Sequence, residues 1–437
     1  MKIIGIIAEY NPFHNGHAYQ IKKIKEELQA DFVVVTMSGD FVQRGTPAII
    51  DKYTRAKMAL SCGADLVIEL PVLWATSSAE SFAMAGVTLF DKMGCVDGIC
   101  FGAETDDLDT LSMIADILVC EPDAYRASLS SHLKDGIVFP AARSKALCDY
   151  FALYPAFCFP NSAHGNAEIT LDVISSILNE PNNILAIEYL KALKRRNASL
   201  TPYVIKREGA GYHEEKILDI TTEAPAPTAS ATAIRNVLDM QTHSADYQTL
   251  DALVSAMPKS VLDILKEHIS NCNLVNQNDF SSILGYKLLA SDIYALSDIG
   301  DVNSDVANRL LKNRMNFSSF EQFCERNKSK DVTYSRISRV LLHLILNITN
   351  SDYAFGKELD YIPYLRILGF RKDASALLKE LKTNTQVPII SKLADASSFL
   401  DANAMTILEK DIFAADLYSQ ICANKSQNAP VSEYSKN

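Results

Sequence analysis

Two histidines and a glycine near the N-terminus have the types and spacing needed to handle phosphate. His14 and His17 enclose Asn15 and Gly16 in the sequence EYNPFHNGH, between an apolar run and a helical pattern. The first N–H groups of a helix and its dipole attract anions, and a glycine lets the backbone approach them closely. Imidazoles can donate to the same anion. The pattern therefore indicates attack at the α-phosphorus of ATP, because fixed donors stabilise the negative charge that develops there.

The same two histidines have less specific interpretations. They could occur together by chance, or they could form a metal-binding pair. The position of the loop, directly after a buried strand and before a helix, favours the phosphate site over both. We therefore expect no metal held by the protein, although Mg²⁺ should accompany the phosphates.

Polar and basic side chains after the other strands could contact phosphate or an acceptor substrate. Asp40 and Arg44 belong to the sequence SGDFVQRG after the second apolar run, and a guanidinium can hold a carboxylate or phosphate by paired hydrogen bonds. Gly102 follows the fourth run and could let adenosine approach the backbone. Arg207 and Arg235 could stabilise a leaving pyrophosphate, because a guanidinium stays charged and matches phosphate oxygens. Turn residues and surface ion pairs are the alternatives at these positions.

The charge distribution bears on nucleic-acid binding. A net charge of −11 argues against indiscriminate coating of nucleic acid. Basic residues are nevertheless concentrated in the segment 191–207, which holds six and no acid, and in the segment 309–339, which holds eight and three acids. Both could be solvated helix faces, but local positive charge on an acidic protein is also what selective RNA binding needs.

The loops that carry this chemistry need a sheet to bring them together. Apolar runs typical of strands buried on both faces occur at residues 2–8, 31–37, 65–70 and 96–101. Stretches with helical spacing separate them, at residues 16–28, 52–62 and 77–90. This alternation predicts an α/β fold with a Rossmann-like parallel sheet and helices on both faces. Ligands of such sheets bind beyond the carboxyl ends of the strands.

The middle of the chain continues with helices and one more strand. Residues 106–180 are expected to be mainly helical, and residues 203–207 to form a strand. A Pro/Ala-rich loop then leads to Ser230 or Thr232, either of which could cap a helix that begins near Ala233.

The C-terminal half has helical spacing almost throughout, from about Pro258 onward. We therefore predict a Rossmann-like nucleotidyltransferase domain that binds ATP over residues 1–240. An α-helical domain should follow over residues 241–424, and a polar, disordered tail over residues 425–437.

Composition indicates a globular protein of a reducing compartment. Hydrophobic residues make up 48% of the chain, but no apolar run reaches the roughly 18 residues that span a membrane. The opening apolar run lacks the cleavage site of a signal peptide. The nine cysteines are scattered without a Cys-x-x-Cys pair, which argues against a zinc site. We expect a cytoplasmic protein.

Six sequence blocks, in order, resemble the bacterial tRNA(Met) cytidine acetate ligase family, which shares the HxGH motif of nucleotidylyltransferases. The blocks are EYNPFHNGH at 9–17, MSGDFVQRG at 37–45, FGAE at 101–104, PNNIL at 181–185, KREGAGYH at 206–213 and SATAIR at 230–235. The similarity continues through LGY at 284–286 and YLRILGF at 364–370. One small departure is SAT at 230–232, where the family tends to have paired serines.

The resemblance implies a two-step reaction. Members of the family form acetyl-adenylate from ATP and acetate, then pass the acetyl group to N4 of the wobble cytidine of elongator tRNA(Met). Carried over by motif, His14, His17 and Arg207 would be catalytic. The ATP-binding residues would be Ile7, Ala8, Glu9, Tyr10, Asn11, Pro12, Phe13, His14, Asn15, Gly16, His17, Ala18, Tyr19, Gln20, Gly102, Asn182 and Arg207. Asn183 is an alternative to Asn182, because the motif has two asparagines.

Further contacts are expected around this site. Asp40, Arg44, Asn183 and Arg235 are candidates for contacts to phosphate or to the acceptor. The candidates for tRNA contacts are the α-helical domain and the basic residues Lys191, Lys194, Arg195 and Arg196.

Two other functions remain compatible with the HxGH loop by itself. An adenylyltransferase that makes a dinucleotide such as NAD or dephospho-coenzyme A would need no RNA. A non-catalytic RNA-binding protein on a nucleotide-binding fold would bind ATP without turnover. Acetate-dependent exchange of pyrophosphate into ATP would separate these functions from an acetate ligase.

Overall fold

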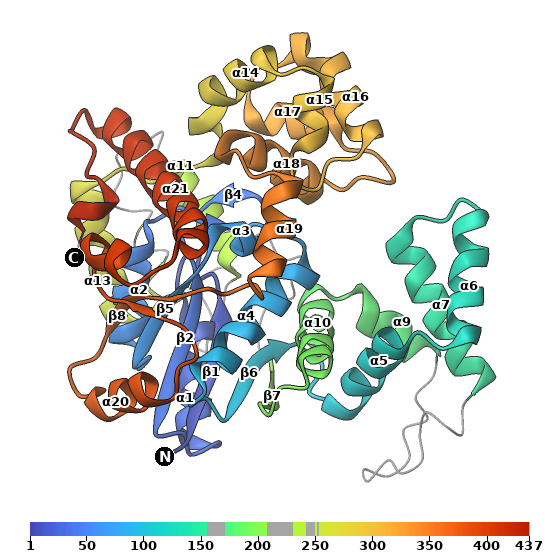
Figure 1. Ribbon diagram of the computed structural model, residues 1–437, viewed down its shortest axis with the longest axis horizontal. Helices are drawn as coiled ribbons and strands as arrows, with labels where there is room; N and C mark the ends of the chain where they lie inside the picture. Colours follow the sequence, from blue (N-terminus) through green and yellow to red (C-terminus); the bar gives the residue numbers. More distant parts are fainter. Residues whose placement is uncertain (155–170, 208–229, 242–249, 251–252, 437) are drawn as a thin grey trace. The chain divides into compact units, whose positions relative to one another are not determined.

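The computed structural model describes residues 1–154, 171–207, 230–241, 250 and 253–436 (Figure 1). The chain forms two compact units. The first unit combines Met1–Ile99 with Glu208–Asn437, and the second unit is Cys100–Arg207. This division differs from the expected boundary at residue 240. Most of the KREGAGYH block and of the Pro/Ala-rich loop lies outside the described residues.

A mostly parallel sheet of seven strands carries the fold, in the order β7-β6-β1-β2-β5-β8-β9. Its strands are β1 (Ile3–Ala8), β2 (Phe32–Ser38), β5 (Leu66–Leu70), β6 (Gly98–Ala103), β7 (Thr201–Lys206), β8 (Leu365–Phe370) and β9 (Ile389–Ile390). β1 pairs in parallel with β2 and with the start of β6, and β2 pairs in parallel with β5. The four apolar runs therefore form the parallel strands that were predicted. A two-stranded hairpin of β3 (Phe41–Val42) and β4 (Thr46–Pro47) follows β2.

Helices of the first unit pack closely on this sheet. They are α1 (Asn15–Glu26), α2 (Lys52–Ser61), α3 (Val72–Ala75) and α4 (Ala79–Met93). The ring of Phe90 on α4 fills the space where Gly5 would carry a Cβ atom, and Ile7 does the same at Gly86. Since any side chain at these two glycines would overlap a neighbour, they allow α4 to lie directly on β1.

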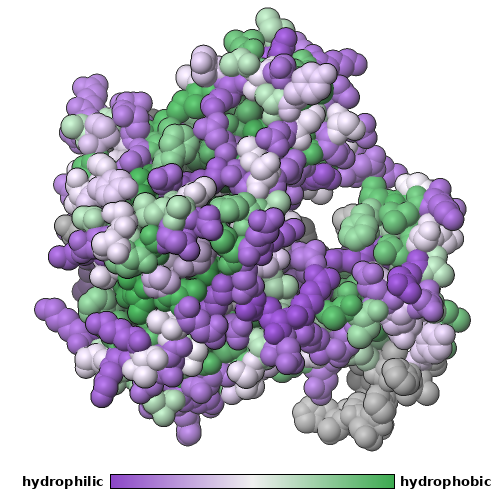
Figure 2. Space-filling model, viewed as in Figure 1, coloured by the Kyte–Doolittle hydropathy of each residue, from purple (hydrophilic) through white to green (hydrophobic). Residues whose placement is uncertain are grey.

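The second unit is mainly helical, as predicted for residues 106–180 as far as they are described. Its helices are α5 (Leu108–Cys120), α6 (Asp123–Lys134), α7 (Phe139–Leu153), α9 (Leu171–Asn179) and α10 (Pro181–Arg196). α10 packs on α5, and α6 packs on α7. α6 and α7 leave Leu133, Phe139 and Leu153 exposed, and apolar residues are visible over this pair of helices in Figure 2.

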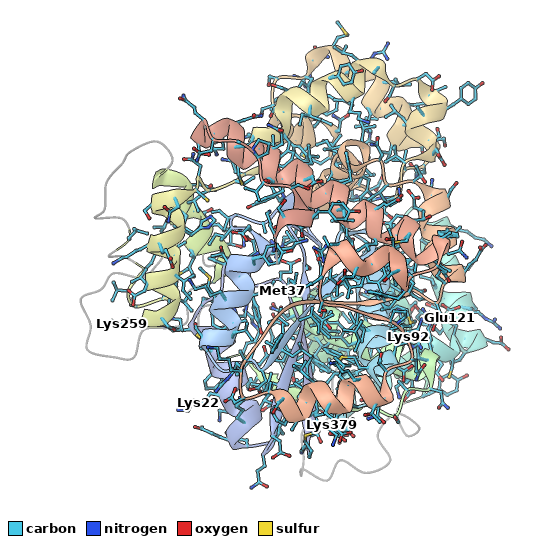
Figure 3. All side chains as sticks on the ribbon, turned by 60° about the vertical axis from the view of Figure 1, so that its left-hand side comes forward. Lys22, Met37, Lys92, Glu121, Lys259 and Lys379 are labelled. Carbon is cyan, nitrogen blue, oxygen red and sulfur yellow. The ribbon has the colours of Figure 1, made fainter. Side chains whose placement is uncertain are left out.

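The C-terminal part of the first unit is largely helical. Its elements are α11 (Ala231–Gln241), α13 (Lys259–Asn271), η1 (Gln277–Phe280), α14 (Ser281–Ala290), α15 (Ile293–Asp298), α16 (Ser304–Asn313), η2 (Arg314–Asn316), α17 (Phe320–Asn327), α18 (Tyr334–Leu346), α19 (Asn350–Glu358), α20 (Ser375–Asn384), η3 (Leu393–Ser398), α21 (Ala402–Ser426) and η4 (Glu433–Ser435). Ser230 caps α11, because its hydroxyl accepts from the backbone N–H of Ala233 at 3.1 Å. α13, which carries Lys259, packs on α2 (Figure 3).

Two expectations for this part of the chain are wrong. The helical pattern is interrupted by β8, which pairs antiparallel with β5; a short apolar run cannot be assigned to helix or strand by periodicity alone. The expected disordered tail over 425–437 is instead structured as far as residue 436. η4 holds it, because Glu433 is fully buried and forms ion pairs with Lys52 and Arg366.

Among the described residues, no helix combines the length and apolar character needed to cross a membrane.

Candidate active site

His14 and His17 hold each other in place at the start of α1. His14 is the N-cap residue, and its Nδ1 accepts from the backbone N–H of Gly16 at 3.0 Å. His17 Nδ1 accepts from the backbone N–H of His14 at 3.2 Å. The two imidazoles stack with their ring centroids 3.7 Å apart. The pair is thus a capping box in which both members are histidines.

This geometry fixes the tautomer of both rings. An imidazole nitrogen that accepts a hydrogen bond from a backbone N–H carries no proton. The neutral rings of His14 and His17 therefore carry their proton on Nε2. In this tautomer, the N–H donor of each ring is Nε2–H.

Apolar and basic neighbours support the pair. The ring centroids of Tyr10 and Phe13 lie 4.7 and 5.3 Å from that of His17, and both aromatic side chains are buried. Arg235, on α11, donates from Nη1 to the backbone carbonyl of Asn11 at 2.7 Å. The fold therefore brings Arg235 to the HxGH loop, although more than 200 residues separate Arg235 from Asn11 in the sequence.

One expectation about the loop is wrong. The first amides of α1 were expected to be unbonded, but the N–H of Asn15 donates to the carbonyl of Ala256 at 3.0 Å. The N–H of Gly16 is taken by His14. The N-cap side chain and a neighbouring backbone segment satisfy these amides, so neither of them is a bare donor.

Arg55 forms hydrogen bonds with the backbone at the carboxyl ends of both β1 and β2. Its guanidinium is fully buried and donates to the carbonyls of Glu9 at 2.6 Å, Ser38 at 3.1 Å and Ile50 at 2.9 Å, and also to that of Gly39. Desolvation lowers the pKa of Arg55. A single side chain therefore fixes the backbone that leads into both candidate loops.

A buried ion-pair network lies beside Arg55. Lys52 Nζ binds Glu69 at 2.8 Å and Glu433 at 2.6 Å, and Arg366 binds both carboxylates as well. Desolvation and Arg366 lower the pKa of Lys52, but Glu69, Asp40 and Glu433 outweigh them and raise it. Desolvation acts to raise the pKa of Glu433, yet Lys52 and Arg366 dominate and hold it at about 2. The Glu69 carboxylate occupies the place of a Cβ at Gly39, which explains the glycine of SGDFVQRG.

The predicted residues of that loop have different surroundings. Asp40 is buried, and its Oδ1 accepts from the backbone N–H of Lys52 at 2.8 Å. Desolvation raises the pKa of Asp40 to about 6. Arg44 is half-buried in the turn of the β3–β4 hairpin. Ser38 Oγ is buried and has no hydrogen-bond partner in the described structure, which is a costly state that a ligand would relieve.

The second unit holds the other predicted group, arranged around Glu104. Asn182 Nδ2 donates to Glu104 Oε1 at 2.5 Å, and the backbone N–H of Asn183 donates to Glu104 Oε2 at 2.9 Å. Asn183 Oδ1 accepts from the N–H groups of Glu104 and Thr105 at 3.0 and 3.1 Å. Asn183 is buried and holds the loop, whereas Asn182 is half-buried.

Gly102 and Arg207 also lie together in the second unit. A Cβ at Gly102 would be 3.4 Å from Arg207 Cγ, so the arginine stem lies over the glycine backbone. The backbone N–H of Arg207 donates to the carbonyl of Ala103 at 2.9 Å. Desolvation lowers the pKa of Arg207, and Glu104 opposes that shift.

The basic residues of α10 differ in their accessibility. Lys191 is buried, and its Nζ donates to Glu188 Oε2 at 2.6 Å. Its charge is balanced inside the unit, so we withdraw Lys191 as a candidate tRNA contact. Lys194 and Arg195 are exposed, and Arg196 is half-exposed. Lys194 forms an ion pair with Asp116 at 2.6 Å, a surface pair of the kind that contributes little to stability.

Within the described ranges, no three His, Cys, Asp or Glu side chains are arranged to hold a metal ion.

The chain is similar to known proteins over nearly its full length. The model of the HIGH Nucleotidyl Transferase family matches residues 1–433. A relative from Thermoanaerobacter sp. strain X514 is 40% identical over 427 residues, 98% of this chain and 97% of the relative. One from Clostridium perfringens is 37% identical over 419 residues, 96% and 95% of the two chains. Both relatives are named tRNA(Met) cytidine acetate ligase.

The chain belongs to the tRNA(Met) cytidine acetate ligase family of HIGH nucleotidyl transferases.

The family fold is also seen in solved structures. Apo TmcAL of Thermotoga maritima has a TM-score of 0.86 and 29% identity, with 100% of this chain and 98% of that chain covered. TmcAL bound with alpha-thio ATP has a TM-score of 0.83 and 28% identity, with 100% and 97% covered. The fold class expected from the sequence is confirmed by these matches and by the sheet.

Several buried charged residues of this family member lie outside the sequence blocks that carry the resemblance, although two features of the sequence indicate three of them. Glu69 is an acid within a buried apolar strand, which requires a buried cationic partner. Lys52 and Arg55 are cations in the first turn of α2, where the helix dipole disfavours them unless other groups compensate. No comparable local signal identifies Glu433.

Proposed function

We propose that this chain is a tRNA(Met) cytidine acetate ligase. It forms acetyl-adenylate from ATP and acetate and then acetylates N4 of the wobble cytidine of elongator tRNA(Met). The observation that carries the proposal is the capped histidine pair, which lies just after the carboxyl end of β1 with its Nδ1 atoms held by backbone N–H groups. The name shared by relatives over nearly their full length supplies the substrate class.

In the first step, an acetate oxygen attacks the α-phosphorus of ATP and pyrophosphate leaves. His14 and His17 donate to the phosphate oxygens as negative charge accumulates there. Arg207 and Arg235 balance the charge of the leaving pyrophosphate. The remaining ATP contacts are those carried over from the family motif, with Asn182 as the asparagine that touches ATP and Asn183 as the residue that positions it.

Acetate enters at the carboxyl end of β2. The buried and unpartnered Ser38 Oγ supports this placement, since a carboxylate would accept its hydrogen bond. Arg44, on the hairpin that follows, is the candidate cation for the same carboxylate. Asp40 acts indirectly, because its carboxylate is used by the backbone of α2.

In the second step, the cytidine amine attacks the acetyl carbonyl, loses its proton and displaces AMP. Positioning supplies much of this step, because the mixed anhydride is already activated. Lys194, Arg195 and Arg196 remain the candidate phosphate contacts on α10. We place the reaction in the cytoplasm, where tRNA and ATP are available.

Mg²⁺ is proposed as a companion of the nucleotide, because it is commonly held through substrate phosphates and water. It would neutralise the charge of the phosphates of bound ATP.

Acetate-dependent exchange of labelled pyrophosphate into ATP tests the first step without RNA. We expect exchange with acetate and none without it. A dinucleotide-forming adenylyltransferase would exchange pyrophosphate only when its mononucleotide co-substrate is supplied, whether or not acetate is present, and a non-catalytic RNA-binding protein would show no exchange. Either result would contradict the proposal.

A further inference from the structure

Four large side chains around the junction of α14 and α15 are unusually exposed. Tyr294 is 82% exposed, Met315 78%, Tyr286 70% and Leu289 61%. Side chains of this type are normally covered, and a group of them on a surface marks a site of interaction. None of them has a role in the acetate-activating site described above.

The four side chains lie on three adjoining elements of the fold. Tyr286 and Leu289 are three residues apart on α14 and therefore share a helix face. Two residues connect α14 to α15, which carries Tyr294 in its first turn. The turn η2 carries Met315 and packs on α14, where a Cβ at Gly285 would lie 3.1 Å from the Phe317 ring. We call Tyr286, Leu289, Tyr294 and Met315 the aromatic platform.

η2 is also tied to the junction itself. Arg314 Nη1 donates to the carbonyl of Ser291 at 3.2 Å, between α14 and α15. The platform is thus held by backbone and packing contacts rather than by contacts among its own exposed side chains.

Exposed cations lie on α16, which packs on α15 and η2, and on α17, which packs on α16. Lys312 on α16, Arg326 on α17 and Lys330 after it are exposed and form no hydrogen bond or ion pair with any described residue. α17 is fixed to α16, because Asn313 Nδ2 donates to Asn327 Oδ1 at 3.0 Å. The acid Glu325 is already paired with Lys328 at 2.6 Å.

This surface is connected to the hairpin beside the candidate acetate site. α18, which follows α17, donates from Ser338 Oγ to the carbonyl of Gly45 at 2.8 Å. Gly45 has a φ of +77°, and the Arg339 backbone fills the place of its Cβ. The helices α14–α18 are therefore anchored within the first unit to the turn that carries Arg44.

We propose that the aromatic platform and the three cations bind a single-stranded loop of the substrate RNA. Bases stack on Tyr286 and Tyr294, Leu289 and Met315 pack at their edges, and Lys312, Arg326 and Lys330 meet the phosphates. Exposed aromatics together with unpaired cations on adjoining helices are the combination that single-stranded nucleic acid requires. The three exposed cations give this surface local positive charge, which favours a polyanion such as RNA on a chain whose net charge is −11. The inference rests on the proposed function, from which the RNA substrate comes.

The test measures the affinity of the full chain for elongator tRNA(Met) by fluorescence anisotropy. Tyr286→Ala and Tyr294→Ala should each weaken binding about tenfold, because stacking on one base typically contributes that much. Tyr286→Phe and Tyr294→Phe should bind like the wild type, since they keep the ring. Phe413→Ala on α21 is the matched control, because Phe413 is exposed outside the platform, and its affinity should be unchanged.

The cations have a separate signature. Lys312→Ala and Arg326→Ala should each reduce the slope of log Kd against log salt concentration by about 0.7, the value for one lost contact to a single strand. Unchanged tRNA affinity in folded Tyr286→Ala and Tyr294→Ala proteins would overturn the proposal. So would a change in oligomeric state, measured by sedimentation, without a change in tRNA affinity.

Pyrophosphate exchange separates this inference from the proposed function. Exchange with acetate needs no RNA and should be the same in the platform variants and the wild type. If the wild type bound tRNA without exchanging pyrophosphate, and Tyr286→Ala weakened that binding, the acetate reaction would be wrong and the platform would be right. Normal exchange together with unaffected tRNA binding in the variants would support the acetate reaction and overturn the platform.

Discussion

At the scale of residues, the central feature is that two histidines use their Nδ1 atoms to cap a helix and keep their Nε2 protons. Capping residues are usually Ser, Thr, Asp or Asn, which would satisfy the same amides but offer no donor of this reach. The choice of histidine therefore combines a structural task with a chemical one. The sequence predicted the pair and its place, but it could not predict that Gly16 and Asn15 would have their amides occupied.

His17→Ala should lower acetate-dependent pyrophosphate exchange by about 100-fold, the usual effect of removing one donor to a transition state. The fold should be retained, since the hydrogen bond to the backbone N–H of His14 is local to the start of α1. His132→Ala is the control, because His132 forms a surface pair with Asp149 in the second unit. Near-normal exchange in a folded His17→Ala protein would refute the role of the imidazole.

Asn182 and Asn183 should differ in the kind of defect they produce. Asn183→Ala leaves two backbone N–H groups without their acceptor and should destabilise the second unit by about 1–3 kcal/mol. Asn182→Ala should leave stability nearly unchanged and raise KM for ATP. Thermal unfolding and exchange kinetics of the two variants decide between them. If Asn183→Ala instead raised KM for ATP and Asn182→Ala lowered stability, Asn183 would be the ATP contact.

At the scale of elements, one buried ionic network joins parts of the chain that are remote in sequence. α2, β5, β8 and η4 each contribute a charged residue, and Arg55 connects the same helix to the ends of β1 and β2. The parallel strands could be predicted because each is a continuous apolar run. β8 and η4 could not, since a short run and a polar tail acquire their structure only from partners such as β5 and Lys52.

Glu433→Gln should destabilise the first unit by about 3 kcal/mol at pH 7, because it leaves Lys52 and Arg366 short of a buried counter-charge. The buried single tryptophan, Trp74, provides a fluorescence signal for urea unfolding of this unit. Glu358→Gln, at an exposed position of α19, is the control and should unfold like the wild type. A variant as stable as the wild type would mean that the network does not hold the tail.

The effect of Glu433 should depend on pH with a defined sign. Its folded pKa, about 2, lies below the ordinary value of 4.5, so its stabilisation is full well above pH 4.5 and is lost as the pH falls toward 2. The difference between wild type and Glu433→Gln should therefore be about 1 kcal/mol smaller at pH 3.5 than at pH 7. Asp40 has the opposite effect: because burial raises its pKa to about 6, its contribution to stability increases as the pH falls from about 6 to 4. A difference that grows on acidification would contradict the ion pairs.

At the scale of the whole molecule, the candidate site residues fall on two compact units. The HxGH loop, Arg235 and Arg55 belong to the first unit, and Gly102, Asn182 and Arg207 to the second. The sequence blocks identified both groups and the family, because each block lies at a strand end or helix start. They could not reveal that the chain leaves the first unit near residue 100 and returns after residue 207.

The most direct test of the proposed function is to incubate the purified protein with ATP, labelled acetate and total tRNA, and then to analyse the nucleosides. We expect label in N4-acetylcytidine, confined to elongator tRNA(Met) and absent when ATP is omitted. Label that stays out of cytidine, in a preparation that still exchanges pyrophosphate with acetate, would contradict the assigned acceptor. Label in no nucleoside, together with no exchange, would contradict both steps of the reaction.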